Sequence, residues 1–204
     1  ALYVVAASNN ITVTISNKEA FVAWSKAKVR PQFHIKIDTG MHRQGFQIED
    51  LLAVIKKLKT KNYKLKTYFT GIYTHFAMAK DGDDMAFTRK QLVVFKEACA
   101  LFEVAGFDNV ICHASATGGT LLGKEFHCAM VRVGIGLYGI WPSAELERQL
   151  SDKIKLIPAL TLHSVISEIK IVKKGEGVGY DLTERVTRDT RLAIIPIGYW
   201  HGIP

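Results

Sequence analysis

Apolar and polar positions follow two different periods along the first part of the chain. From Ile11 to Ile15 every second residue is apolar, which is typical of a half-buried β-strand. Residues 20–27 then carry apolar side chains at helical spacing, and Ser16 with Glu19 in front of them fits a capping box. We therefore predict a strand followed by a capped helix.

The same change of period recurs further along the chain. A second helix is predicted around residues 48–58, with an apolar stripe made of Ile48, Leu51, Leu52, Ile55 and Leu58. A third, ended by Gly106, has the stripe Leu92, Phe95, Cys99 and Phe102. Short β-branched and aromatic runs predict the remaining strands at 33–38, 69–75, 109–113 and 130–133, with a short helix at 117–122 before the last.

Repeated strand–helix units imply parallel strands joined by right-handed crossovers. Five such units indicate an α/β protein, a partial (β/α)8 TIM-type barrel that starts partway round. After residue 142 the pattern changes to a long β-rich stretch at 156–172, a Gly-rich turn and a strand at 192–197. We predict an incomplete barrel over residues 1–150 and the beginning of a mostly-β C-terminal domain over residues 151–204.

Composition narrows the class of protein. Of the 204 residues, 48% are hydrophobic and 23% are charged, the usual balance of a soluble globular protein. No apolar run reaches the ~18 residues of a membrane span, and no secretory leader is recognisable. We expect no membrane partner. The chain begins at Ala1 rather than Met and ends at Pro204 directly after a motif, so we expect truncation at both ends.

The net charge of +8 admits two interpretations, a nucleic-acid surface or the solvated face of a helix. Few aromatic residues are interleaved with the basic ones for base stacking, which favours the solvated face and no nucleic-acid partner. The basic run consists of Lys56, Lys57, Lys59, Lys61, Lys64 and Lys66.

The cysteines indicate neither a disulfide framework nor a metal site. Cys99, Cys112 and Cys128 are odd in number and lack Cys-x-x-Cys spacing, which suits the reducing cytoplasm. Two of them adjoin His113 and His127, but neighbouring residues of a strand point to opposite faces, so each pair could offer one zinc ligand at most. We expect no metal.

Ionisable residues gather where the predicted strands end. Lys36 lies at the end of one strand with Arg43 seven residues on, and His75, His113 and Arg132 mark the ends of three others. Functional groups of parallel barrels collect at the carboxyl ends of strands. A lone core histidine or a rim lysine is usually structural, but several converging strand ends describe a cationic pocket for an anionic, phosphate-bearing ligand.

The segment Gly175-Glu-Gly-Val-Gly179 looks like a phosphate-binding loop at first sight. It lacks the Gly-x-Gly-x-x-Gly spacing, and no helix is predicted after it. We interpret it as a turn before Tyr180.

Five motifs in order carry a resemblance to a known family. Residues 34–45 read His-Ile-Lys-Ile-Asp-Thr-Gly-Met-His-Arg-Gln-Gly, which resembles the alanine racemase signature Lys-x-Asp-Thr-Gly-Met-x-Arg-x-Gly. The similarity extends from about residue 11 to the end of the chain. It implies an isomerase that depends on pyridoxal 5'-phosphate. The other matching segments are 70–77, 130–139, 177–180 and 195–199.

The resemblance implies roles for the strand-end residues. Lys36 matches the lysine that many members carry as a carbamate (N6-carboxylysine), an anion that would orient Arg43 towards the cofactor and the substrate carboxylate. His75 would pack beside the pyridine ring. Arg132 would donate to the pyridine nitrogen, with His113 supporting it from behind, and would keep that nitrogen unprotonated.

Further positions match the phosphate site and the second acid/base. The cofactor phosphate would bind the Thr117 hydroxyl and the backbone N–H groups of Gly134 and Ile135. Tyr180 matches the tyrosine that acts as a base on the partner subunit of a homodimer, and Tyr199 would lie at the substrate entrance. Spacing alone would leave Tyr180 a structural turn residue.

Three features depart from the family pattern. An asparagine of the family is Ala116 here, and an aspartate is His201. No segment matches the strand whose lysine forms the Schiff base with the cofactor. We therefore expect these 204 residues alone to be inactive.

The resemblance implies that the parent protein interconverts L-alanine and D-alanine by two-base α-proton exchange, supplying D-alanine for peptidoglycan in the bacterial cytoplasm. Three alternatives remain: a broader racemase acting on serine or basic amino acids, a non-catalytic pyridoxal-phosphate-binding barrel, and a basic nucleic-acid-binding module. The β-rich stretch after residue 155 argues against the single barrel.

Overall fold

The computed structural model describes residues 2–60 and 63–203. The chain divides into two compact units, Ala1–Ala159 and Leu160–Pro204. Of the basic run, Lys61 and the side chain of Lys64 lie outside the described residues, whereas Lys56, Lys57, Lys59 and Lys66 are exposed. No helix in the described ranges is both long enough and apolar enough to cross a bilayer.

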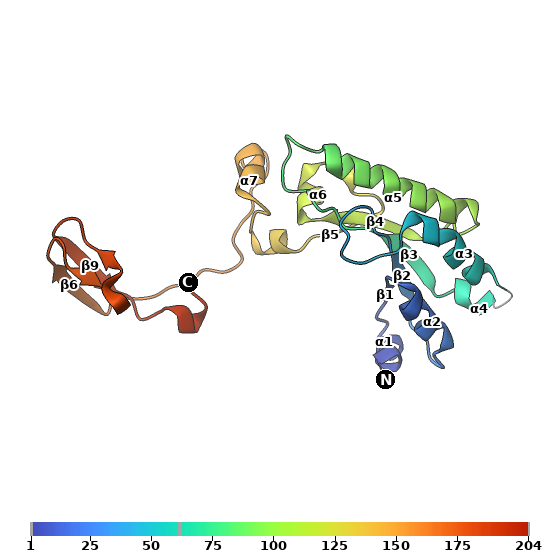
Figure 1. Ribbon diagram of the computed structural model, residues 1–204, viewed down its shortest axis with the longest axis horizontal. Helices are drawn as coiled ribbons and strands as arrows, with labels where there is room; N and C mark the ends of the chain where they lie inside the picture. Colours follow the sequence, from blue (N-terminus) through green and yellow to red (C-terminus); the bar gives the residue numbers. More distant parts are fainter. Residues whose placement is uncertain (1, 61–62, 204) are drawn as a thin grey trace. The chain divides into compact units, whose positions relative to one another are not determined.

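A parallel five-stranded sheet forms the centre of the first unit (Figure 1). Each strand pairs with the next along the chain, so the order β1-β2-β3-β4-β5 follows the sequence. This is the partial α/β barrel that the alternating pattern predicts. The strands are β1 (Val13–Ile15), β2 (Phe33–Lys36), β3 (Phe69–Tyr73), β4 (Ile111–Ala116) and β5 (Met130–Arg132).

Helices connect the strands and cover one face of the sheet (Figure 1). Between β1 and β4 they are α2 (Lys18–Lys26), η1 (Ile48–Asp50), α3 (Leu51–Lys59), α4 (Tyr63–Lys66) and α5 (Ala86–Val104). The unit also contains α1 (Leu2–Ser8), α6 (Thr117–Leu122), η2 (Lys124–Phe126), η3 (Ile135–Tyr138) and α7 (Ala144–Leu150).

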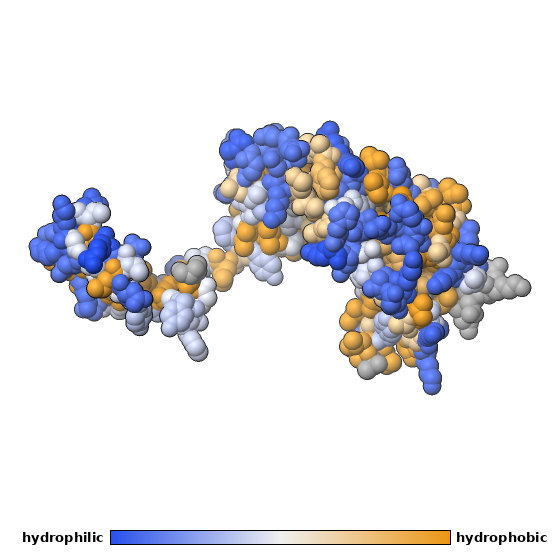
Figure 2. Space-filling model, in the orientation of Figure 1, coloured by the Kyte–Doolittle hydropathy of each residue, from blue (hydrophilic) through white to orange (hydrophobic). Residues whose placement is uncertain are grey.

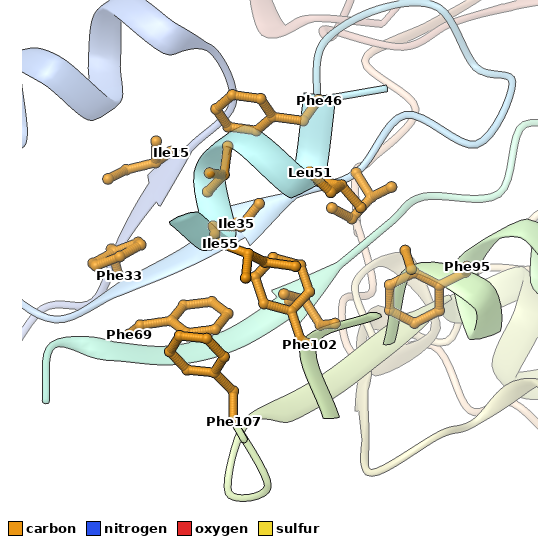
Figure 3. Close-up of a cluster of buried hydrophobic side chains, with 14 of the residues drawn as sticks. Ile15, Phe33, Ile35, Phe46, Leu51, Ile55, Phe69, Phe95, Phe102 and Phe107 are labelled. Atoms are coloured by element: carbon orange, nitrogen blue, oxygen red, sulfur yellow. The ribbon is translucent and has the colours of Figure 1, made fainter. Parts of the chain in front are cut away.

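The core lies between this face of the sheet and the helices α2, α3 and α5. Ile35 of β2 is fully buried there, and Phe102 of α5 packs on Phe69 of β3 with ring centroids 5.1 Å apart (Figure 3). Burying a large apolar side chain of this kind stabilises a fold by about 1.5–3 kcal/mol. The alternate residues of the strands, including His34 and Tyr73, therefore face away from the core.

The second unit is built from two short antiparallel pairs. Strand β6 (Glu168–Val172) pairs with β9 (Thr190–Ile194), and β7 (Gly177–Val178) pairs with β8 (Glu184–Arg185). Two 3-10 turns complete it, η4 (Tyr180–Leu182) and η5 (Tyr199–His201). Within the Gly-rich segment, Gly175 lies in a turn but Gly177–Val178 form β7, so the predicted turn covers only part of the segment before Tyr180.

Several predictions of local structure were wrong. The cap of α2 is Asn17 and not Ser16: the backbone of Asn17 is extended, and its Oδ1 accepts from the Ala20 N–H at 2.7 Å. Leu52 is 65% exposed, and Val54 takes its place in the core. Residues 156–167 form no strand, and the strand of the predicted stretch 156–172 is confined to Glu168–Val172.

Apolar side chains also lie at the surface. The helix α1 exposes Leu2, Val4 and Val5, and Figure 2 shows hydrophobic residues at the surface around this helix.

Candidate functional site

The guanidinium of Arg132, at the end of β5, is fixed by four polar contacts. Its Nη1 lies 2.7 Å from Nδ1 of His113, and its Nη2 donates to the carbonyl oxygens of Thr74 and Ala114, each at 2.8 Å. The same Nη2 is 3.4 Å from Nδ1 of His75. All of these partners belong to β3, β4 or the residues that follow β3, so the arginine joins three strand ends.

His113 and His34 extend the hydrogen bonds of Arg132 across the sheet. Nε2 of His113 is 2.8 Å from Nδ1 of His34 on β2. Because arginine can only donate, His113 Nδ1 must accept, and the proton of a neutral His113 therefore sits on Nε2 and is donated to His34. Burial, followed by the charge of Arg132, lowers the pKa of His113 to about 3. Burial and Arg132 also lower the pKa of His34.

The ring of Tyr73 contacts three basic side chains. Its ring stacks on the imidazole of His113 with centroids 4.8 Å apart and planes 6° from parallel. Arg132 and Lys36 lie near the same ring, at 5.1 Å and 5.6 Å from its centroid. The Tyr73 hydroxyl is 3.0 Å from Oγ1 of Thr14, which holds the ring in place. The π face of Tyr73 attracts each of these cations and offsets part of their repulsion.

Lys36 is only 2% exposed at the end of β2. Its Nζ donates to the carbonyl oxygens of Ile37 at 3.1 Å and Gln44 at 3.4 Å. Burial lowers the pKa of Lys36 to about 8, with further lowering from Arg132 and Arg43 against the opposing effect of Asp38. A substantial fraction of this amine is therefore neutral near physiological pH.

The loop after β2 owes its shape to Asp38 and two glycines. Oδ1 of Asp38 accepts from the backbone N–H groups of Gly40 at 3.0 Å and His42 at 3.1 Å. Gly45 has a φ of +129°, and a Cβ there would meet the Asp38 backbone nitrogen at 2.6 Å. The Asp-x-Gly and terminal glycine of the motif are therefore what fold the loop back onto its own strand. Arg43 is exposed on this loop.

Lys36, Arg43, His75 and Arg132, all named from the sequence, affect one another electrostatically. Burial lowers the pKa of His75, and Arg132, Arg43 and Lys36 lower it further by charge repulsion. Lys36 responds to the same two arginines. The four side chains thus form one electrostatic cluster that favours a bound anion.

A cavity of about 290 Å³ opens beside this cluster. Thr117 stands at its wall, and its Oγ1 accepts from the backbone N–H of Gly134 at 2.9 Å and of Gly136 at 3.3 Å. With both acceptor positions used, the hydroxyl proton of Thr117 remains available to a ligand. The residues predicted for cofactor and phosphate that line the cavity are His75, Thr117, Arg132, Gly134 and Ile135.

Comparison with known proteins decides the family. The profile of the alanine racemase N-terminal domain matches residues 2–142, and that of the alanine racemase C-terminal domain matches residues 159–204. The chain belongs to the alanine racemase family. Its similarity covers both units.

Individual relatives agree with this assignment. The chain is 34% identical over 198 residues to alanine racemase of Leptospira interrogans, covering 95% of the chain and 50% of the relative. It is 36% identical over 171 residues to alanine racemase 1 of Bacillus subtilis, covering 83% of the chain and 42% of the relative. The chain therefore spans about half the length of these racemases.

Solved structures of racemases share the fold. The crystal structure of Bacillus anthracis alanine racemase with bound L-Ala-P has a TM-score of 0.77 at 32% identity, covering 97% of this chain and 51% of that one. Histidine racemase from Leuconostoc mesenteroides has a TM-score of 0.70 at 28% identity, covering 99% of this chain and 53% of that one.

Two tyrosines singled out by the racemase resemblance belong to the second unit. Tyr180 begins η4 and is 94% exposed, and Tyr199 begins η5 and is 86% exposed. Asp181 and Leu182, which follow Tyr180, both have positive φ values, 57° and 49°. Such backbone strain in residues other than glycine often accompanies a functional position.

Two of the three departures from the racemase pattern have local structural settings. Ala116 lines the cavity with a methyl group where the family has an amide. His201 lies in η5, where its Nδ1 accepts from the backbone N–H of Gly198 at 3.3 Å. The imidazole therefore helps to hold this turn.

Sequence reasoning missed three participants in the site. It gave His34 no partner, and it assigned no role to Tyr73 or to Gln91, a buried residue of α5 that bonds the backbone of His75 and Ala77. Tyr73 precedes His75 by two residues, so the alternation of side chains was a usable signal. His34 reaches His113 across the intervening strand β3, where Gly71 provides the room, since a Cβ there would lie 2.6 Å from the His34 ring.

Proposed function

We propose that this chain is part of an enzyme that interconverts L-alanine and D-alanine with pyridoxal 5'-phosphate as its cofactor. The observation that carries the proposal is the anchored Arg132 beside the cavity. Its hydrogen bonds to described residues use only the two Nη atoms, which leaves the Nε–H for a bound group.

The donors around the cavity fit this cofactor. Arg132 offers an N–H to a ring nitrogen and, because a guanidinium keeps its proton, does not pass that proton on. The Thr117 hydroxyl and the backbone N–H of Ile135 suit a phosphate, whereas the Gly134 N–H would have to leave Thr117 Oγ1, to which it donates at 2.9 Å, before it could join them. When bound, pyridoxal phosphate withdraws electrons from the substrate α-carbon and so acidifies the α-proton.

The residues of this chain would bind and orient the reactants. His75 would pack beside the cofactor ring as a neutral imidazole, since its pKa is lowered by burial and by Arg132. Arg43 would bind the substrate carboxylate from its exposed loop. Lys36, as a carbamate, would turn from a competing cation into an anion that orients Arg43.

Racemisation needs an acid/base on each face of the α-carbon. We assign one to the hydroxyl of Tyr180 acting on the second subunit of a homodimer, in keeping with its exposure, and we place Tyr199 at the substrate entrance. The other belongs to the cofactor-bearing lysine of the family, which no residue of this chain matches. By itself this chain would therefore not racemise alanine. In the cell the enzyme would work in the bacterial cytoplasm and supply D-alanine for peptidoglycan.

The test uses the complete protein that contains these residues, incubated with pyridoxal phosphate and L-alanine in deuterium oxide. We expect D-alanine to appear with deuterium at the α-carbon, and the Tyr180→Phe variant to bind the cofactor but to lose racemisation. Absence of both D-alanine and α-deuteration in the unaltered protein contradicts the proposal.

A racemase of other specificity is the second candidate. It is favoured by the histidine racemase of Leuconostoc mesenteroides, whose structure matches 99% of this chain. The same deuterium exchange measured on a panel of alanine, serine, histidine and lysine separates the two. The alanine proposal requires the largest kcat/KM for alanine.

A further inference from the structure

Gln91 lies on α5 with its side chain fully buried, outside the lining of the cavity. All three polar contacts of its amide reach residues that follow strands. Nε2 donates to Oγ1 of Thr39 at 3.1 Å and to the carbonyl oxygen of His75 at 3.4 Å, and Oε1 accepts from the backbone N–H of Ala77 at 2.8 Å. Since a carbonyl needs a donor and an N–H needs an acceptor, only this orientation of the amide satisfies both.

A second pair of hydroxyls extends the network to Arg132. Oγ1 of Thr39 lies 2.8 Å from Oγ1 of Thr74, and both threonines are buried. The carbonyl oxygen of Thr74 in turn accepts from Nη2 of Arg132 at 2.8 Å. Gln91 is therefore joined to the backbone that carries His75 directly and to the guanidinium through Thr39 and Thr74.

A glutamine buried in an apolar helix face is costly unless its amide is paired. An apolar residue of the same volume would serve packing between α5 and the sheet equally well. The amide does something that packing cannot do: its hydrogen bonds fix the position of the backbone of residues 74–77 relative to the end of β3. Loops after strands otherwise lack ladder partners for these backbone groups.

We propose that Gln91 is a positioning residue that sets His75 and Arg132 at the mouth of the cavity through the backbone of residues 74–77. This inference rests on the proposed function for its purpose, because a cofactor ring is what the two side chains would meet. Misplacing such groups by about 1 Å costs on the order of 100-fold in rate, so a buried brace is effective far from the chemistry.

The experiment compares Gln91→Met with Thr88→Val by NMR of the complete protein that contains this chain, prepared without cofactor. Thr88 is also fully buried on α5, three residues earlier, and its hydroxyl has no hydrogen-bond partner among the described residues. In Gln91→Met we expect amide hydrogen exchange at Ala77 to quicken by about 10-fold or more. We also expect the pKa of His75 to rise towards 6.5 as the ring leaves Arg132. Thr88→Val should change neither.

An unchanged Ala77 exchange rate and an unchanged His75 titration in Gln91→Met overturn the inference, as do equal changes in Thr88→Val. Should Gln91→Met not fold, the unaltered chain still decides, because rapid exchange at Ala77 would exclude a bond to a buried amide. A third variant, Gln91→Glu, keeps the acceptor and should keep Ala77 protected while the His75 titration shifts.

Cofactor binding and racemase activity of the complete protein separate this inference from the proposed function. If the complete protein binds pyridoxal phosphate, Gln91→Met should weaken that binding about 10-fold, whereas Thr88→Val should not. If the complete protein neither binds the cofactor nor racemises, the proposed function fails, while the NMR result on His75 and Ala77 still supports or overturns the role of Gln91.

Discussion

Nη1 of Arg132 and Nδ1 of His113 lie 2.7 Å apart, and this contact determines the protonation of the histidine. An arginine has no acceptor atom, so the pair is a hydrogen bond only while His113 is neutral at Nδ1. Protonating His113 would place two cations in contact in a part of the fold where His113 is 3% exposed. The pair therefore links the integrity of the site to pH.

The first prediction concerns stability against pH. The pKa of His113 in the fold, about 3, lies below the ordinary value of 6.5, so its neutral form stabilises the fold. This contribution is fully present above pH 6.5 and is lost as the pH falls towards 3. Between these values the unfolded chain binds one more proton at His113 than the folded chain does. The free energy of unfolding therefore falls by about 1.4 kcal/mol for each unit by which the pH is lowered. Urea unfolding from about pH 4.5 to 6.5 measures the slope.

The pKa values of His34 and His75 are also lowered, so these histidines add pH dependence of the same sign. The His113→Phe variant is therefore needed to isolate the contribution of His113. At neutral pH we expect the variant to lose about 1–3 kcal/mol, since Arg132 loses its acceptor. That loss should shrink as the pH falls. The exposed His163 is the control, and His163→Phe should retain the full slope. A constant gap between unaltered protein and His113→Phe at all pH values would contradict the assignment.

The second prediction concerns the geometry of Arg132. Lysine offers one ammonium on a flexible stem and cannot hold the bonds to His113, Thr74 and Ala114 while presenting an N–H to the cavity. We expect Arg132→Lys to lower the free energy of unfolding by about 1–3 kcal/mol and to abolish tight cofactor binding. Arg89, whose pair with Glu125 is exposed, is the control. Arg89→Lys should cost less than about 1 kcal/mol by urea unfolding.

The sequence allowed prediction of the parts of the fold that depend on local periodicity. Every strand of the parallel sheet has the predicted order, and so do α2, α3, α5 and α6, because each alternation of period needs only its neighbours; the short α4 was not predicted. The β-structure predicted for residues 156–167 was not found, for the opposite reason. Ile157 and Leu160 are β-prone or apolar, but they are 71% and 84% exposed, and a strand requires a partner that periodicity does not report.

The candidate site was only partly readable from the sequence. Lys36, His75 and Arg132 could be named because strand ends converge in a parallel barrel. The contact of His34 with His113 depends on strand register and on the space above Gly71, which no spacing rule encodes. The role of Gln91 was not predicted, because Gln91 lies within the apolar stripe of a helix and helical periodicity does not show which polar residue of a buried face has hydrogen-bond partners.

The third prediction concerns the loop that carries Arg43. Gly45→Ala would introduce both an unfavourable φ of +129° and a collision with the Asp38 backbone nitrogen. We expect a loss of about 3 kcal/mol in the free energy of unfolding. Gly106 has a φ of +81° but open space around it, so Gly106→Ala measures the φ penalty alone, about 1–2 kcal/mol. Equal losses in the two variants would show that the loop moves aside without cost.

The last prediction concerns carbamylation of Lys36. The neutral amine attacks carbon dioxide, a bond forms between Nζ and the carbon, and one proton is released, so the reaction requires the deprotonated lysine. Because burial lowers the pKa of Lys36 to about 8, about half of the amine is neutral at pH 8 and about 1% at pH 6. The product is an anion beside Arg132 and Arg43, whose charges stabilise it.

We therefore expect a carbamate signal in 13C NMR of the chain at fixed dissolved 13C-labelled carbon dioxide, strong near pH 8 and weak near pH 6. Lys36→Gln should remove the signal. Lys18→Gln should not, because the bond to Asp50 raises the pKa of Lys18 and keeps that amine protonated. A signal that survives in Lys36→Gln would assign the modification elsewhere. A signal as strong near pH 6 as near pH 8 would show that burial does not hold Lys36 in its neutral form.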